Sequence, residues 1–234
     1  MNQIRLLFTN AGRRTYMMEF ALALDTGNTP LQVVAADCDP FAPTLHVPGV
    51  EAAITPPVLK DPGKYKKHIL SLVHQTEVDL IVPLSDLDQQ ILADAVGDFM
   101  ALGCKVSVSK PETVRACVDK KISYAFCGKA GLPMPESKFR LDECDDVGPS
   151  VFKPILGSGS ADTCRIESRD DLKAFVDGVH MVQEWVEGTE YGLDIFNDLN
   201  GKFVSVCVKR KLLMRSGETD RSVVVQNPGI EALA

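Results

Sequence analysis

The sequence has no long apolar run. Its longest apolar stretches, residues 31–36 and 78–84, have the length of strands, whereas a helix that spans a bilayer needs about 20 residues. No small-residue cleavage site follows the N-terminal segment, so the pattern predicts no signal peptide. The sequence therefore predicts no membrane association.

Charge of one sign is not concentrated anywhere in the chain. The net charge is −7, and neither basic nor acidic residues form a long block. Because nucleic-acid binding needs a concentrated basic face, no nucleic-acid partner is predicted. The densest basic group is Lys209-Arg210-Lys211, which indicates either a solvated strand edge or a contact with an anion.

Spacings typical of metal sites and disulfides are also missing. The seven cysteines are odd in number and include no Cys-x-x-Cys pair, which favours free thiols in a reducing cytoplasm. The four histidines show no ligand spacing, so no metal-ligating residue is predicted.

What is present is the composition of a globular protein. Hydrophobic residues make up 45% and charged residues 24% of 234 residues, enough chain for two domains. Residues 1–110 alternate short apolar runs with helical patterns, which favours parallel strands joined by crossover helices in a small doubly wound sheet. Strands are predicted at 4–9, 31–36, 78–83 and 105–108, and helices at 13–24, 64–75 and 86–102.

Residues 111–234 show a different pattern. Two short helices, at 113–118 and 119–129, precede a series of strands with one further helix at 168–176, for which Ser168 is the expected N-cap. Strands are predicted at 138–140, 150–154, 161–167, 180–186, 191–197 and 203–208. This order favours an antiparallel sheet in an α+β domain after the first, Rossmann-like α/β domain.

Two common nucleotide signatures are absent or incomplete. The P-loop pattern does not occur. Of the dinucleotide fingerprint, only Gly12 follows the first strand, and Asp37 lies at the end of the second, where a ribose-binding acid would lie. These two residues are compatible with an NAD site or with a tight strand-to-helix turn.

A stronger anion signal lies in the second region. A strand presents Lys153, and a loop of small residues follows: Gly157, Ser158, Gly159 and Ser160. Small residues let backbone N–H groups approach phosphate oxygens, and the lysine adds a point charge. An ordinary glycine-rich hairpin explains the loop alone equally well.

The segment 182–194 favours a nucleotide. The main chain of Glu184 to Val186 could pair with adenine, with Gln183 reaching the exocyclic amine and Glu190 accepting hydrogen bonds from the ribose. The alternative is a polar-faced hairpin, but a hairpin does not call for a lysine and glycine loop about 30 residues earlier.

These motifs together resemble the ATP-grasp superfamily, in its carbamoyl-phosphate-synthase-like and carboxylate–amine ligase branch. The resemblance covers nearly the whole chain and rests on segments 7–14, 36–39, 81–88, 119–120, 131–135, 151–163 and 183–194. It implies a pre-ATP-grasp domain over residues 1–110 and the N-terminal part of an ATP-grasp domain over 111–234.

The resemblance also implies roles for single residues. Lys120 and Lys153 match the lysines that hold the phosphates of ATP. Gln183, Glu184 and Val186 match the adenine edge, and Glu190 matches the ribose ligand. The basic residues expected near the γ-phosphate or acyl phosphate, as catalytic groups, are Lys209, Arg210 and Arg215.

The reaction that the resemblance implies joins a small-molecule carboxylate to an amine or ammonia through an acyl phosphate, with ATP and Mg²⁺. The family's later acidic and Glu-x-Asn metal ligands do not occur before Ala234, so the chain is expected to be truncated and inactive alone. An incomplete sheet leaves an apolar face and an edge, which predicts a homo-oligomer or a complementing C-terminal fragment. A non-catalytic nucleotide-binding or assembly subunit and an NAD-linked oxidoreductase remain as alternatives.

Overall fold

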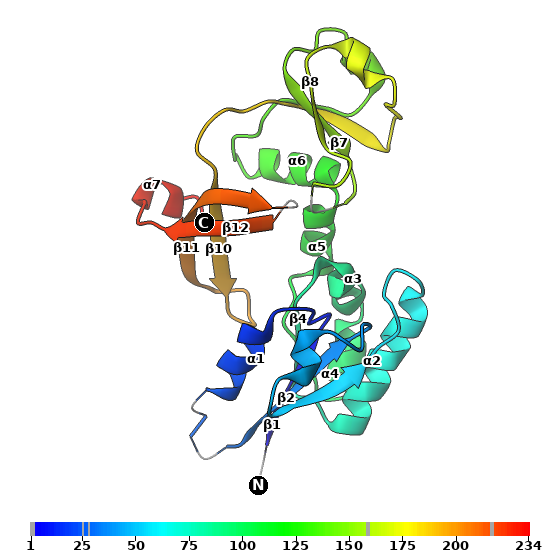
Figure 1. Ribbon diagram of the computed structural model, residues 1–234, viewed down its shortest axis with the longest axis vertical. Helices are drawn as coiled ribbons and strands as arrows, with labels where there is room; N and C mark the ends of the chain where they lie inside the picture. The colour runs from blue at the N-terminus through cyan, green and yellow to red at the C-terminus, as the bar shows by residue number, and fades with distance from the viewer. Residues whose placement is uncertain (1–2, 25, 28, 158–159, 216–217) are drawn as a thin grey trace. The chain divides into compact units, whose positions relative to one another are not determined.

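The structure is a computed structural model that describes residues 3–24, 26–27, 29–157, 160–215 and 218–234 (Figure 1). The chain divides into two compact units, Met1–Val114 and Arg115–Ala234. Helix α5 (Pro111–Val118) contains the point of division. Within the described residues, no helix is long and apolar enough to cross a membrane.

The first unit is built on a parallel sheet with the strand order β3-β2-β1-β4-β5. The strands are β1 (Ile4–Thr9), β2 (Leu31–Asp37), β3 (Val50–Ile54), β4 (Leu80–Pro83) and β5 (Lys105–Val106). The helices are α1 (Thr15–Leu22), η1 (Pro43–His46), α2 (Pro62–Thr76), α3 (Asp86–Asp94) and α4 (Val96–Ala101). All strand pairs are parallel, so the predicted α/β class is confirmed.

Helices cover both faces of this sheet. Leu7 belongs to a core cluster that includes Tyr65 and Ile69 of α2, whereas its neighbour Phe8 belongs to a second cluster with Met18 of α1. Successive strand residues point to opposite faces, so β1 contributes to two cores at once. Burial on both faces explains the three consecutive apolar residues, Leu6 to Phe8, within the strand.

Two elements of the first unit differ from the prediction. Strand β3 was missed because Val50–Ile54 contains glutamate and two alanines, and it forms by pairing at the sheet edge with β2 alone. The predicted helix 86–102 is two helices, since the backbone at Ala95 leaves the helical region (φ −107°, ψ 9°).

The second unit is antiparallel as predicted, but its strands form two sheets instead of the single predicted one. One has the order β6-β9-β7-β8 and the other the order β10-β11-β12. The strands of the first are β6 (Ser137–Lys138), β7 (Ser150–Pro154), β8 (Cys164–Ile166) and β9 (His180–Glu184). The second contains β10 (Tyr191–Asn197), β11 (Phe203–Arg215) and β12 (Glu218–Val224). The helical segments are α6 (Lys120–Lys129), η2 (Leu141–Glu143), η3 (Arg169–Leu172) and α7 (Pro228–Glu231).

Several elements of the second unit differ from the prediction, including the unpredicted short helices η2 and α7. The helix expected at 168–176 is only the short 3₁₀ turn η3, in which Asp171 accepts hydrogen bonds from the backbone N–H groups of Glu167 and Ser168. Strand β11 continues to Arg215, and β12 was missed, since its polar sequence gives no alternating signal. Pairing with β11 forms β12.

Candidate nucleotide site

The first sheet of the second unit brings two predicted residues together. In the β7–β9 pair, Val151 lies opposite Gln183 and Lys153 opposite Met181. Residues opposite each other, and residues two apart on one strand, share a face. Lys153 and Gln183 therefore project from the same face, and Lys153 Nζ donates to Gln183 Oε1 at 2.7 Å.

Helix α6 brings a second lysine to the end of β7. Asp119 forms an isolated bridge with Leu156, and Lys120 N donates to Ile155 O. Asp119 also caps the helix, accepting from the N–H groups of Lys121 and Ile122. The Lys120 ammonium group donates to Gly157 O at 2.9 Å and to Ile155 O at 3.4 Å. This lysine is thereby tied to the start of the glycine-bearing loop.

The two ammonium groups are electrostatically coupled. Burial lowers the pKa of Lys153, and the charge of Lys120 lowers it further. Burial also lowers the pKa of Lys120, while Asp119 opposes that shift. Among the described residues, neither ammonium group forms an ion pair with a carboxylate. Two partly buried cations that lack a carboxylate partner attract an anion.

The loop itself is described in part. Ser158 and Gly159 lie outside the described residues. Gly157 has φ 120°, a conformation that favours glycine, and Ser160 has φ 55°. The two described residues that flank Ser158 and Gly159 in sequence therefore both have positive φ.

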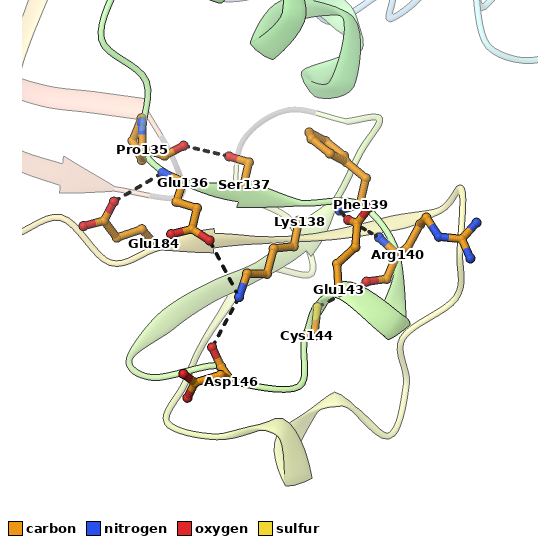
Figure 2. Close-up of polar contacts among 10 residues, drawn as sticks. All are labelled: Pro135, Glu136, Ser137, Lys138, Phe139, Arg140, Glu143, Cys144, Asp146 and Glu184. Atoms are coloured by element: carbon orange, nitrogen blue, oxygen red, sulfur yellow. Dashed lines mark hydrogen bonds and ion pairs between the residues drawn. The ribbon is translucent and has the colours of Figure 1, made fainter.

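The predicted adenine edge presents backbone groups rather than the Glu184 side chain. Glu184 lies opposite Ser150, on the other face of the sheet from Lys153, and its carboxylate accepts from Glu136 N at 3.2 Å (Figure 2). The N–H groups of Glu184 and Trp185 donate to Glu136 O and Pro149 O. For Val186 N–H, no hydrogen bond occurs within the described part of the chain, so it is the donor available to a base.

Strand β11 of the second sheet carries all three predicted catalytic cations, and the predicted ribose ligand Glu190 directly precedes β10. Glu190 Oε1 lies 2.5 Å from Lys211 Nζ, and Lys209 pairs with Asp194. Lys209 and Arg210 are consecutive in a regular part of β11, so they project to opposite faces. Lys211 and Asp194 were missed as site residues, although the period of two in a strand places Lys211 beside Lys209.

Arg215 lies apart from this group of charges. Its guanidinium group contacts Asp220 of β12 at 3.4 Å. The three cations predicted to be catalytic therefore do not share one face, and their role stays a prediction.

A pocket of about 250 Å³ lies on the face of the β6-β9-β7-β8 sheet that is opposite to Lys153. Its charged lining is Glu136, Lys138, Asp146 and Glu184, and Lys138 Nζ already contacts Glu136 Oε1 and Asp146 O (Figure 2). Since this lining is mainly acidic, the pocket does not suit a phosphate.

In the first unit, the polar residues at the carboxyl ends of the strands have internal partners. Asp37 accepts from Gly12 N at 2.8 Å and from Asp39 N at 2.9 Å, and Gly12 has φ 56°. These contacts form a tight strand-to-helix turn. Both carboxylate oxygens of Asp37 are therefore already engaged, and Asp37 is the acid that an NAD ribose would need as its acceptor.

Asp88, which follows β4, is fully buried. Its Oδ2 accepts from Tyr65 OH at 2.6 Å, and Tyr65 OH accepts from Asn10 Nδ2 at 3.2 Å. Burial raises the pKa of Asp88 and that of Tyr65. Through the Tyr65 hydroxyl, Asp88 of α3 is thus linked by hydrogen bonds to α2 and to Asn10, which follows β1.

Two family models match this chain. Residues 6–107 match the model described as the PylC-like N-terminal domain, and residues 117–229 match that of the ATP-grasp domain. The second range contains Lys120, Lys153 and the segment 183–190.

The known proteins to which the chain is similar include two ligases and a biotin carboxylase domain. The D-alanine–D-alanine ligase of Francisella tularensis subsp. holarctica (strain LVS) is 31% identical over 90 residues, covering 35% of this chain and 30% of the ligase. The L-amino acid ligase from Bacillus licheniformis gives a TM-score of 0.70 at 15% identity, covering 97% of this chain and 56% of that one. The biotin carboxylase domain of Hydrogenobacter thermophilus 2-oxoglutarate carboxylase, in complex with MgADP and bicarbonate, gives 0.67 at 15% identity.

The match to the biotin carboxylase domain covers all of this chain and 56% of that domain's chain. The chain therefore spans about half the length of the solved structures and under a third of the curated relative.

Proposed function

Since this chain belongs to the ATP-grasp superfamily, we propose that its second unit binds ATP, with the phosphates held by Lys120 and Lys153. The observation that carries the proposal is the pair of coupled ammonium groups, both with lowered pKa and both without a carboxylate partner among the described residues. Gly157 and Ser160, with Ser158 and Gly159 between them in sequence, border the phosphates in this proposal.

The base and sugar are assigned to the segment that follows β9. Val186 N–H and the main chain of Glu184 pair with adenine, Gln183 supplies a side-chain acceptor, and Glu190 accepts from the ribose hydroxyls. Glu190 is 62% exposed and paired with Lys211. The Lys211 side chain is only 23% exposed, so the pair is half-buried, but its carboxylate end is accessible to a ribose.

The proposed reaction is ligation of a carboxylate to an amine or to ammonia, as in carbamoyl-phosphate-synthase-like ligases. A carboxylate oxygen attacks the γ-phosphorus, the bond from that phosphorus to the bridging oxygen breaks, and ADP leaves. The amine nitrogen then attacks the acyl carbon, the carbon–oxygen bond to phosphate breaks, and the nitrogen loses a proton. The names of the D-alanine–D-alanine ligase and the L-amino acid ligase support this class.

Lys209, Arg210 and Arg215 are the proposed stabilisers of the negative charge that develops on the transferred phosphoryl group. Lys209 is the best placed, because it shares a face of β11 with Lys211 and hence with Glu190. Arg210 projects from the other face, and Arg215 lies at the end of the strand.

Magnesium is expected for phosphoryl transfer of this kind. Among the described residues, no three carboxylate, histidine or cysteine side chains come together, so no magnesium ligand is assigned in this chain. No step of the proposal therefore runs through a metal.

We also propose that the chain associates, either with a second copy or with a complementing fragment, through the β10-β11-β12 sheet. Ile195 is 49% and Val223 42% exposed on the face that also carries Tyr191 and Val206. β12 pairs only with β11 among the described strands, so it offers an edge.

A reducing cytoplasm is the proposed location, because it suits the seven cysteines, all of which are unpaired.

The test of the proposed reaction is ADP formation with mixed amino acids, ammonia or bicarbonate, with hydroxylamine present to trap an acyl phosphate. Ligation predicts carboxylate-dependent ADP release and a hydroxamate product. ATP binding without either product would leave a non-catalytic nucleotide-binding subunit. Competition between NAD and ATP separates both from an oxidoreductase, and binding of NAD alone would contradict the proposal.

A further inference from the structure

A chain of side-chain hydrogen bonds crosses three neighbouring strands beside the candidate site. Lys153 Nζ on β7 donates to Gln183 Oε1 on β9 at 2.7 Å, and Gln183 Nε2 donates to Ser137 Oγ on β6 at 2.9 Å. Ser137 Oγ in turn donates to Pro135 O at 3.0 Å, the contact drawn in Figure 2. The strand register places Ser137 and Val151 on either side of Gln183.

The two ends of this chain fix its direction. An ammonium group donates hydrogen bonds and accepts none, so the Gln183 atom that faces Lys153 is the amide oxygen. A backbone carbonyl only accepts, so the Ser137 hydroxyl donates to Pro135 and has its lone pairs free for Gln183. The amide nitrogen of Gln183 therefore faces Ser137. A flipped amide would place its NH₂ group against the Lys153 ammonium group.

We infer that Ser137 is a positioning residue that holds the Gln183 amide with its oxygen on the Lys153 side, and that this orientation makes the site select a purine with a hydrogen-bond donor at the 6-position. The inference rests on the proposed ATP site. An amide oxygen has two acceptor positions, and Lys153 occupies one of them. Within the described residues, the other has no donor. This second acceptor position of the Gln183 oxygen can accept a hydrogen bond from the 6-amino group of adenine, whereas it repels the 6-oxo group of hypoxanthine.

Ser137 acts on selectivity because it penalises the wrong amide orientation. Loss of its hydroxyl leaves Lys153 as the only group that distinguishes the two ends of the amide. One neutral hydrogen bond corresponds to roughly a fivefold change in an equilibrium constant. In Ser137→Ala the equilibrium between the two amide orientations shifts by about this factor, so the ratio of ATP affinity to ITP affinity is expected to fall, by at most about fivefold.

The experiment is a calorimetric titration of the full chain with ATP and with ITP. Ser137→Thr keeps the hydroxyl and is expected to keep the wild-type ratio. Gln183→Glu keeps only acceptors and retains the preference for ATP, while Gln183→Met loses it. Ser71→Ala is the matched control, because it removes a similar bond from Gln75 Nε2 to Ser71 Oγ (3.1 Å) in the first unit.

The outcomes separate the two claims. If the wild type binds ATP and Ser137→Ala keeps the wild-type ratio, the inference is wrong while the proposed function stands. If the wild type binds neither nucleotide, both are wrong. Unfolding temperatures of every variant show whether the fold is retained, and if Ser137→Ala does not fold, an unchanged ratio in Gln183→Met overturns the inference.

Discussion

At the scale of single residues, Lys153 is a side chain whose binding role conflicts with stability. Its pKa is lowered by burial and then by Lys120, so the unfolded chain binds this proton more tightly than the folded chain does. Stability at neutral pH is thus reduced by keeping the ammonium group charged in the fold. Sites that bind charge commonly carry such a cost.

The sign of the pH dependence follows from that shift. Because the folded pKa is below the ordinary lysine value of about 10.4, the lysine's unfavourable contribution to stability shrinks as pH rises from the folded pKa toward 10.4. Urea unfolding at pH 7 and pH 9.5 is expected to show a larger gain in the wild type than in Lys153→Met, which retains only the lowered pKa of Lys120. Equal pH dependence of the unfolding free energy in the two proteins would contradict the lowered pKa of Lys153 in the folded chain.

The buried Asp88–Tyr65 pair gives a second prediction at this scale. The raised pKa of Asp88 means that its contribution to stability is full below the unfolded value and is lost as pH rises through the folded value. Asp88→Asn is therefore expected to be as stable as the wild type at pH 7, or more so. Tyr65→Phe leaves a buried acid without its donor and should cost about 1–3 kcal/mol in urea unfolding.

The contrast between these two variants is the control. A larger loss in Asp88→Asn than in Tyr65→Phe would show that the buried acid is charged and paired with another group.

At the scale of elements, the start of α6 couples helix capping to the candidate site. Asp119 accepts two backbone hydrogen bonds at the N-terminus of α6, next to Lys120. Asp119→Ala should cost about 1 kcal/mol of stability and also weaken ATP binding, because Lys120 loses its anchored position. Unfolding and ATP titration measure the two effects.

A matched control for this change lies in the first unit. Asp61 caps α2 by accepting from Lys64 N at 2.8 Å. Asp61→Ala should lose similar stability and keep the ATP affinity. Equal loss of ATP affinity in both variants would show that the effect is general destabilisation.

The elements also show how far a sequence can be read. Strands β1, β7 and β10 begin and end where the apolar pattern predicts, because their own residues carry the signal. Strand β12 has no such signal and depends on pairing with β11. Likewise, the lysines of the site were visible as motifs. The contact between Gln183 and Ser137 joins residues 46 positions apart and needed the strand register.

At the scale of the whole molecule, the exposed apolar side chains of Ile195 and Val223, on the face of the β10-β11-β12 sheet that also carries Arg210, predict association. Sedimentation velocity over a range of concentrations is expected to show a shift to larger species as concentration rises. Introducing charge on this face, as in Ile195→Lys with Val223→Lys, should restore a monomer. A wild-type chain that stays monomeric throughout would contradict this prediction.

The central claim is that Lys120 and Lys153 form the phosphate site for ATP, and calorimetric titration of ATP into the full chain tests it most directly. The wild type is expected to bind, and Lys153→Met should weaken binding about 10- to 100-fold, the effect of one charge-assisted contact. Lys129→Met, at the far end of α6, should bind as the wild type does. Equal affinity in Lys153→Met and Lys129→Met, or no ATP binding by the wild type, would contradict the account.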